Sequence, residues 1–265
     1  MKIKKLVATA KNVRKLIIEA ACRAKCPHVG PSLSSVELIT ACYFHELNIN
    51  KSNWKNRDIF ILSKGHGALG LYAVMAAKGL LSKKVFNGYF LDKGTLPGHL
   101  DRFTAKGIEA SAGSLGHGFN MALGMAHGFK LKGDKRKVFA LIGDGESEEG
   151  SVWEGAMFAA KLKIDNVTII LDRNNMQGYG RPTELCHYEP IADKWKAFGW
   201  QVYTADGHDF AQILKSFKKP NNGKPKIIIA KTVKGKGISF MEDELKWHYF
   251  IVTEELKNKA LKELA

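Results

Sequence analysis

Two short polar segments carry side chains that suit a divalent cation and a phosphate. Asp144 lies between Gly143 and Gly145, and Asn174 follows 30 residues later. Carboxylate and amide oxygens are hard donors, which suit Mg²⁺ or Ca²⁺ better than zinc. Magnesium usually completes its octahedron with waters and substrate phosphates, so the pair predicts a phosphorylated ligand. The two glycines would let backbone N–H groups approach that phosphate closely.

A glycine-aspartate-glycine triplet alone is a weak signal, because it equally marks a tight turn after a strand. The surrounding elements therefore decide the interpretation. Residues 138–142 and 167–171 are apolar runs typical of buried strands, and residues 151–162 between them have helical spacing. A right-handed crossover brings the ends of both strands to one edge of a sheet. Because ligands bind outside the carboxyl ends of parallel strands, Asp144 and Asn174 are expected to meet at such a site.

The rest of the chain repeats this alternation of helix and strand. Further helices are predicted at residues 3–24, 67–78, 191–198 and 209–218, and further strands at 58–63, 200–203 and 226–230. Near-continuous apolar strands between helices indicate the α/β class, with a doubly wound, mostly parallel sheet covered by helices on both faces. No internal repeat, low-complexity stretch or linker is apparent, so residues 1–265 are expected to form a single domain.

The composition limits the partners and the location of the chain. Its 265 residues include 41 basic and 26 acidic side chains, and the formal net charge of +15 favours anionic partners. The lysines are spread along the whole chain, so a dedicated nucleic-acid interface is not expected. No uncharged apolar stretch approaches the roughly 18 residues of a membrane span, and the basic residues 1–5 precede a charged segment unlike a secretory signal. We therefore expect a cytoplasmic protein without a membrane partner.

The two polar segments together resemble the thiamine diphosphate motif, in which Gly-Asp-Gly ends one strand and Asn-Asn ends the next. The resemblance implies thiamine diphosphate as cofactor, bound with Mg²⁺ or in its place Ca²⁺ or Mn²⁺. It implies that the metal ligands are the side chains of Asp144 and Asn174 and the backbone carbonyl of Met176.

Several further motifs resemble those of transketolases, and together they extend from about residue 10 to residue 250. They are His-Val-Gly-Pro-Ser-Leu-Ser at 28–34, Ser-Lys-Gly-His-Gly at 63–67, Leu-Pro-Gly-His at 96–99, Gly-Ser-Leu-Gly-His-Gly at 113–118, Lys-Gly-Lys-Gly-Ile-Ser-Phe-Met at 234–241 and Trp-His at 247–248. Their order and spacing follow the family. Three positions depart from it: Val29 stands where proline is usual, Pro31 replaces a second glycine, and His117 replaces a glutamine.

Four histidines fall at positions that match these motifs, and the resemblance places them in the substrate channel as catalytic residues. They are His28, His66, His99 and His248. Imidazoles titrate near neutrality, so these side chains are expected to donate to ketose hydroxyls or to move protons as a carbonyl becomes an alcohol. Four other histidines match no motif and are left without a role in the site: His45, His127, His187 and His208.

The resemblance also implies a set of residues that bind the cofactor. This set is His66, Gly113, Ser114, Leu115, Gly143, Asp144, Gly145, Glu149 and Asn174. Glu149 matches a family acid that reaches the neighbouring subunit near the cofactor. Glu154, in the same predicted helix, matches another family acid.

The implied activity is that of a transferase, which moves a two-carbon ketol unit from a ketose phosphate to an aldose acceptor. In transketolases a glutamate on a second, pyrimidine-binding domain activates the cofactor, and that domain is not expected before Ala265. We therefore expect a split enzyme whose partner subunit carries the pyrimidine-binding domain, assembled as α₂β₂. One alternative is a two-carbon transferase for an unusual or branched sugar, and another is a noncatalytic anion-binding protein that retains the fold.

Overall fold

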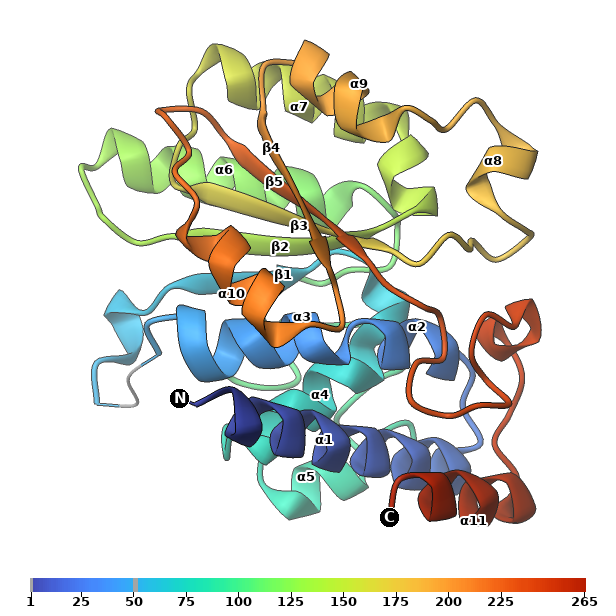
Figure 1. Ribbon diagram of the computed structural model, residues 1–265. Helices are drawn as coiled ribbons and strands as arrows, with labels where there is room; N and C mark the ends of the chain where they lie inside the picture. Colours follow the sequence, from blue (N-terminus) through green and yellow to red (C-terminus); the bar gives the residue numbers. More distant parts are fainter. Residues whose placement is uncertain (1, 50–51) are drawn as a thin grey trace.

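The computed structural model describes residues 2–49 and 52–265, and these are organised around one five-stranded sheet (Figure 1). All neighbouring strands run parallel in the order β1-β2-β3-β5-β4. The strands are β1 (Ile59–Leu62), β2 (Val138–Gly143), β3 (Val167–Arg173), β4 (Gln201–Asp206) and β5 (Lys226–Lys231). Because β2 pairs with β3 so that Gly143 faces Asp172, the polar segments that follow both strands begin side by side.

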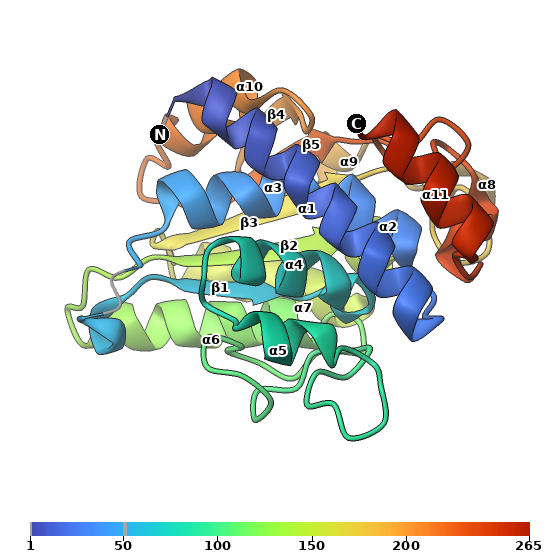
Figure 2. The same cartoon turned by 90° about the horizontal axis from the view of Figure 1, so that it is seen from below.

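Helices cover both faces of the sheet, as Figures 1 and 2 show from two directions. One face carries α1 (Ile3–Ala24), α2 (Val29–Ser34), α3 (Val36–Ala41), α4 (Ala68–Ala77), α5 (Lys83–Asn87), α10 (Phe210–Lys218) and α11 (Glu254–Glu263), and the other carries α6 (His117–Leu131), α7 (Gly150–Lys161) and α9 (Ile191–Ala197). The short α8 (Pro182–Leu185) lies in the loop after β3. Alternate residues of each strand point into two separate apolar cores, for example Leu141 into one and Ile142 into the other. The α/β, doubly wound architecture predicted from the sequence is confirmed.

The predicted strands and helices are all present, and each begins within one residue of its expected start. The longest, α1, buries the apolar stripe of Leu6, Val13 and Ile17, and it ends at Lys25, whose backbone adopts the left-handed conformation with φ of 47°. Helices α6 and α11 are among those that the sequence patterns do not predict. Among residues 2–49 and 52–265, no helix is both long and apolar enough to cross a membrane.

Candidate active site

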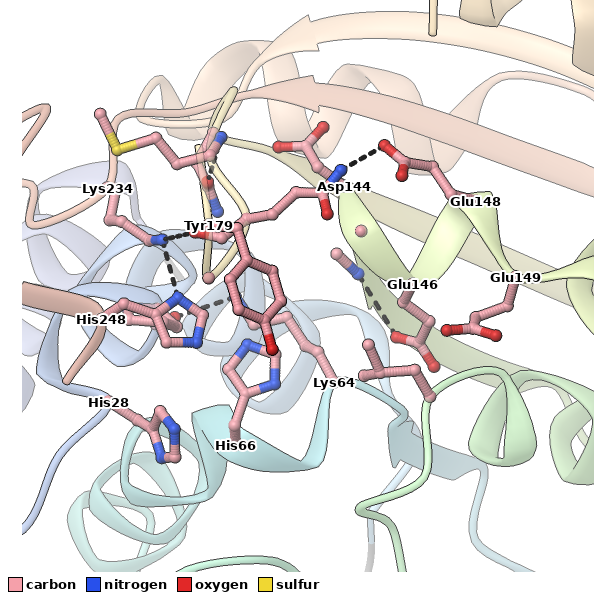
Figure 3. A pocket seen from close by; sticks show the side chains of 18 of the residues that line it. His28, Lys64, His66, Asp144, Glu146, Glu148, Glu149, Tyr179, Lys234 and His248 are labelled. Carbon is pink, nitrogen blue, oxygen red and sulfur yellow. Dashed lines mark hydrogen bonds between the residues drawn. The ribbon is translucent and has the colours of Figure 1, made fainter. Parts of the chain in front are cut away.

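A cavity of about 480 Å³ opens at the carboxyl ends of the central strands (Figure 3). Its walls include twelve of the thirteen residues predicted for the site: His28, His66, His99, Gly113, Leu115, Gly143, Asp144, Gly145, Glu149, Asn174, Met176 and His248. The exception is Ser114, which does not line the cavity although both of its chain neighbours do. Segments far apart in the sequence therefore converge where the strand order predicts a ligand site.

The predicted metal ligands lie together on the loops that follow β2 and β3. The backbone N–H of Asn175 donates to Asp144 Oδ2 at 2.7 Å, which ties the second loop to the first. Asn174 Oδ1 accepts a hydrogen bond from the backbone N–H of Met176 at 3.1 Å, so the amide oxygen and the third expected ligand belong to one tight turn. All three expected ligands line the same cavity.

The environment of Asp144 fits a bound divalent cation. This carboxylate is only 2% exposed, and burial raises its pKa to about 7 although the Arg173 guanidinium, 3.3 Å away, opposes the shift. A carboxylate that is costly to keep ionised in the empty protein gains most when a cation arrives. The described residues hold no cluster of three or more His, Cys, Asp and Glu side chains suited to a metal. One carboxylate, one amide and one carbonyl oxygen are hard donors, and such a set fits Mg²⁺ rather than zinc.

The same end of the cavity has the features of a diphosphate site. Gly143 and Gly145 line it without side chains, and the N-terminus of the twelve-residue helix α7 reaches it at Gly150. Helix N-termini offer unpaired N–H groups and a positive dipole end to anions. Two buried lysines, Lys64 and Lys234, add positive charge to the walls.

Glu146 connects this anion site to the loop that carries Gly113 and Leu115. Its carboxylate accepts hydrogen bonds from the Ser63 hydroxyl and from the backbone N–H of Gly116, the latter at 2.9 Å. Burial raises the pKa of Glu146 to about 7, while these hydrogen bonds oppose the shift. Glu146 therefore fixes the position of three chain segments around the cavity.

The four predicted histidines form one cluster. The ring centroid of His28 lies 5.5 Å from those of His66 and His99 and 5.3 Å from that of His248, and the His66 and His248 rings stack at 5.3 Å. Burial lowers the pKa of His28 to about 4 and that of His248 to about 3, and it places the pKa of His66 well below the usual value. The expectation that all four titrate near neutrality is therefore corrected: these three are neutral at pH 7 and act as hydrogen-bond donors and acceptors.

This cluster should make the stability of the protein depend on pH on the acid side of neutrality. A histidine whose pKa is lower in the folded state is charged more readily in the unfolded state, so stability falls as pH decreases from about 6.5 to 4. We expect the His28→Gln/His248→Gln variant to lose less stability than the wild type over this interval, by about 2 kcal/mol after allowance for the partial exposure of His28. Urea unfolding at pH 4.5 and pH 7.5 measures the difference. Parallel pH profiles for both proteins would contradict the assignment.

Several lining residues are not among the predicted site residues. Lys64 and Lys234 each lie within a motif, directly before a glycine, but their burial becomes evident only in the fold. Tyr249 follows the Trp-His pair, and its ring lies 4.5 Å from that of His248. Tyr179, 84% exposed at the mouth of the cavity, lies outside every motif and has no sequence signal.

Glu149 and Glu154, the two acids that match positions in the family, lie on the outer side of the site. Glu149, at the N-terminus of α7, lines the cavity and is exposed, and Glu154 is exposed one turn further along the same helix. Neither forms an ion pair within the part of the chain that is described. Both carboxylates are thus accessible to another polypeptide.

Comparisons with known proteins agree with this geometry. Residues 5–259 match the family model for the thiamine diphosphate binding domain of transketolase. The chain is 40% identical over 256 residues to the 6-deoxy-6-sulfo-D-fructose transketolase subunit SqwG of a Clostridium species, covering 95% of this chain and 93% of that protein. It is 39% identical over 254 residues to one subunit of the apulose-4-phosphate transketolase of Actinobacillus succinogenes, covering 95% and 92%. The crystal structure of transketolase from Campylobacter jejuni matches with a TM-score of 0.91 at 30% identity over the whole of this chain, which spans 43% of that larger chain.

Proposed function

Because this chain belongs to the transketolase family and carries its thiamine diphosphate binding domain, we propose that it supplies the diphosphate and metal half of the active site in a split transketolase. The observation that carries the proposal is the convergence of Asp144 and Asn174 beside a cavity lined by four histidines. A cofactor that binds together with a metal accounts for the pair of Asp144 and Asn174. A substrate with several hydroxyl groups accounts for the four histidines.

Each part of the cavity then has a task. Asp144, Asn174 and the Met176 carbonyl would hold Mg²⁺, and the Gly143 and Gly145 backbone would receive the diphosphate, since all five residues line the cavity. Thiamine diphosphate, when bound, supplies the nucleophilic carbon that accepts the two-carbon unit of a ketose. The neutral imidazoles orient the sugar hydroxyls and can hold or release a proton at the oxygen of the reacting carbonyl.

The sugar itself is proposed to be a ketose as donor and an aldose, or its phosphate, as acceptor. The names of two relatives support a less common substrate, because one is a 6-deoxy-6-sulfo-D-fructose enzyme and the other an apulose-4-phosphate enzyme. Within this chain the two lysines of the cavity are already engaged, Lys64 with Asp172 and Lys234 with the Gln177 carbonyl. An anionic group at the far end of the sugar would therefore be bound chiefly by the partner subunit.

The partner is proposed to be a second polypeptide that carries the pyrimidine-binding domain, in an α₂β₂ assembly. Two relatives named as subunits support this arrangement, since the chain covers more than nine-tenths of each. The exposed carboxylate of Glu149 at the rim of the cavity is suited to contact that partner.

Reconstitution tests the proposal. The purified chain is mixed with Mg²⁺, thiamine diphosphate, a ketose donor and an aldose acceptor, with and without a second polypeptide that carries the pyrimidine-binding domain. We expect two-carbon transfer only in the presence of both polypeptides, with turnover at least about 100-fold above either alone, since the catalytic groups are divided between them. Full turnover by this chain alone would refute the split arrangement. Salt-sensitive binding to nucleic acid, together with no Mg²⁺-dependent affinity for the cofactor, would instead favour the noncatalytic alternative.

A further inference from the structure

Outside the cavity, three side chains form a largely buried polar network that the chemistry above does not use. Arg14 lies on α1, Glu37 on α3, and His208 follows β4. Both terminal nitrogens of Arg14 donate to the Glu37 carboxylate, at 2.6 and 2.8 Å, and His208 Nδ1 lies 3.0 Å from Glu37 Oε2. Arg14 and Glu37 are each 6% exposed, and none of the three lines the cavity. A buried ion pair adds little stability over well-packed apolar side chains, so the more important property of this network is the backbone that it holds in place.

The network holds the backbone of residues 233–237. The N–H of Val233 donates to His208 Nε2 at 2.9 Å, and Arg14 Nε donates to the Lys236 carbonyl at 2.7 Å. Because a backbone N–H can only donate, Nε2 is the unprotonated nitrogen of His208 and the ring proton lies on Nδ1, facing Glu37. Glu37 thereby selects the tautomer of His208 that can accept from Val233.

Lys234 lies between these two anchored residues, and its side chain reaches the cavity, where Figure 3 shows it beside His248. Its Nζ donates to the Gln177 carbonyl at 3.0 Å and lies 3.0 Å from His248 Nδ1. An ammonium group can only donate, so His248 Nδ1 accepts and the ring proton lies on Nε2. Lys234 therefore sets the tautomer of a cavity histidine, as Glu37 sets that of His208.

The packing of this segment leaves it little freedom to move independently of the network. Gly235 and Gly237 adopt φ angles of +80° and +97°. A Cβ atom on Gly237 would lie 2.6 Å from Arg14 Cδ, and one on Gly235 would lie 2.1 Å from the Met241 carbonyl oxygen. A displacement of Arg14 or His208 would thus be transmitted along the backbone to Lys234.

We propose that Arg14, Glu37 and His208 are positioning residues, which hold residues 233–237 so that Lys234 keeps His248 in its productive orientation and tautomer. The inference rests on the proposed transketolase function for its kinetic consequence. The relay runs from Glu37 through His208 and Val233 to Lys234, with no member of the network touching the substrate. Loss of the network should lower kcat, because His248 would be misplaced in the transition state, and should change KM little.

Two substitutions of His208 separate this role from a purely structural one. In His208→Gln the side-chain oxygen can take the place of Nε2 and accept from Val233, whereas in His208→Asn the shorter amide reaches only the position of Nδ1, facing Glu37. With the partner subunit present, we expect His208→Asn to lower kcat about 10-fold or more, which is the size of loss seen when groups that support a functional side chain are removed. His208→Gln should stay within about 3-fold of wild type, because it keeps the hydrogen bond from Val233. The opposite order would mean that the contact of His208 with Glu37, and not its contact with Val233, supports turnover, and the inference would be wrong.

Glu37→Gln provides a second test with a matched control. Its amide must turn an N–H toward either Arg14 or His208, both of which are donors, so the relay is broken. The control is Glu109→Gln, which breaks another poorly exposed ion pair, with Arg57, away from the cavity. We expect a similar loss of stability in both but a fall in kcat of about 10-fold, at about unchanged KM, only in Glu37→Gln. Equal kcat values in the two variants would overturn the proposal.

Imidazole ¹⁵N spectra of the chain keep this inference separate from the proposed function. The wild type should show the Nδ1–H tautomer for His208 and the Nε2–H tautomer for His248, and Glu37→Gln should disturb both. If the wild-type complex has no two-carbon transfer, the proposed function is wrong while the spectra still decide on the relay. An unchanged His248 signal in Glu37→Gln would show that no relay exists.

Discussion

Replacing Asp144 with asparagine should weaken Mg²⁺-dependent binding of thiamine diphosphate by at least about 100-fold and reduce two-carbon transfer by about 1,000-fold, because the variant removes the only carboxylate among the three proposed metal ligands. Calorimetric titration of the chain with the cofactor and Mg²⁺ measures the first effect. Steady-state rates with the partner subunit measure the second. Wild-type affinity in the variant would mean that the metal lies elsewhere.

The same substitution should stabilise the protein in the absence of metal. Burial raises the pKa of Asp144 to about 7, so the folded state favours the protonated form and wild-type stability falls as pH rises from about 4 to 7. The neutral amide of the variant has no such penalty. We expect the variant to be more stable than wild type by about 2 to 4 kcal/mol at pH 8 and equally stable at pH 4. Saturating Mg²⁺ and cofactor should reverse the order at pH 8.

Urea unfolding at both pH values, with and without the ligands, distinguishes this account from a general effect of removing a charge. Asp165→Asn is the matched control, because that carboxylate is 41% exposed and pairs with Lys130 at the surface. Its effect should stay below about 1 kcal/mol at either pH. A destabilised Asp144→Asn protein at pH 8 would show that hydrogen bonds of the carboxylate, such as the one from Asn175, outweigh its desolvation.

The part of the site that the sequence could predict is the part encoded by consecutive residues at strand ends. The apolar runs before Asp144 and Asn174 identify β2 and β3, and the handedness of the crossover places both loops at one edge. The cluster of His28 with His66, His99 and His248 was accessible only through the family resemblance, because no local pattern relates positions so far apart. Ser114 shows the limit of such a transfer, since its motif reaches the cavity but its side chain does not line it.

Helix α6 escapes prediction because its glycines weaken the helical signal. Gly118, Gly124 and Gly128 lower helix propensity along the segment His117–Leu131. At Gly118 the structure gives the reason: a Cβ atom there would lie 2.6 Å from the Ser63 hydroxyl oxygen. The close approach of the helix to the loop after β1 requires glycine, and tertiary packing offsets the unfavourable propensity.

Buried charges were the other feature that the sequence could not reveal. A lysine in a sequence is by default a surface residue, yet Lys64 is 1% exposed and Lys234 is equally buried. Their burial depends on partners far away in the chain, Asp172 for one and the Gln177 carbonyl for the other. The same holds for Arg14 and Glu37, which lie on two separate helices, so no local pattern indicates that they pair.

The ion pair between Lys64 and Asp172 should be the most costly single interaction to break. Both side chains are almost fully buried, and Asp172 also accepts from the hydroxyls of Ser34 and Thr232. Burial alone would raise the pKa of Asp172, but the charge of Lys64 and these hydrogen bonds outweigh it and lower the pKa. In Lys64→Met the carboxylate keeps its burial and loses its cation, so we expect a loss of about 3 to 5 kcal/mol at pH 8.

A double-mutant cycle in urea tests whether the unpaired charge is the cause. Asp172→Asn in the Lys64→Met background removes that charge, and the double variant should recover at least about 2 kcal/mol of the single variant's loss. The deficit of Lys64→Met should also shrink toward pH 4, because burial without the cation raises the pKa of Asp172 in the variant, so protonation removes the unpaired charge as pH falls. In wild type the lowered pKa keeps Asp172 ionised over the same interval. Lys130→Met, which breaks the exposed pair with Asp165, should change stability by less than about 1 kcal/mol. Strictly additive losses in the cycle would mean that Lys64 acts through packing and its bond to the Pro31 carbonyl rather than through its charge.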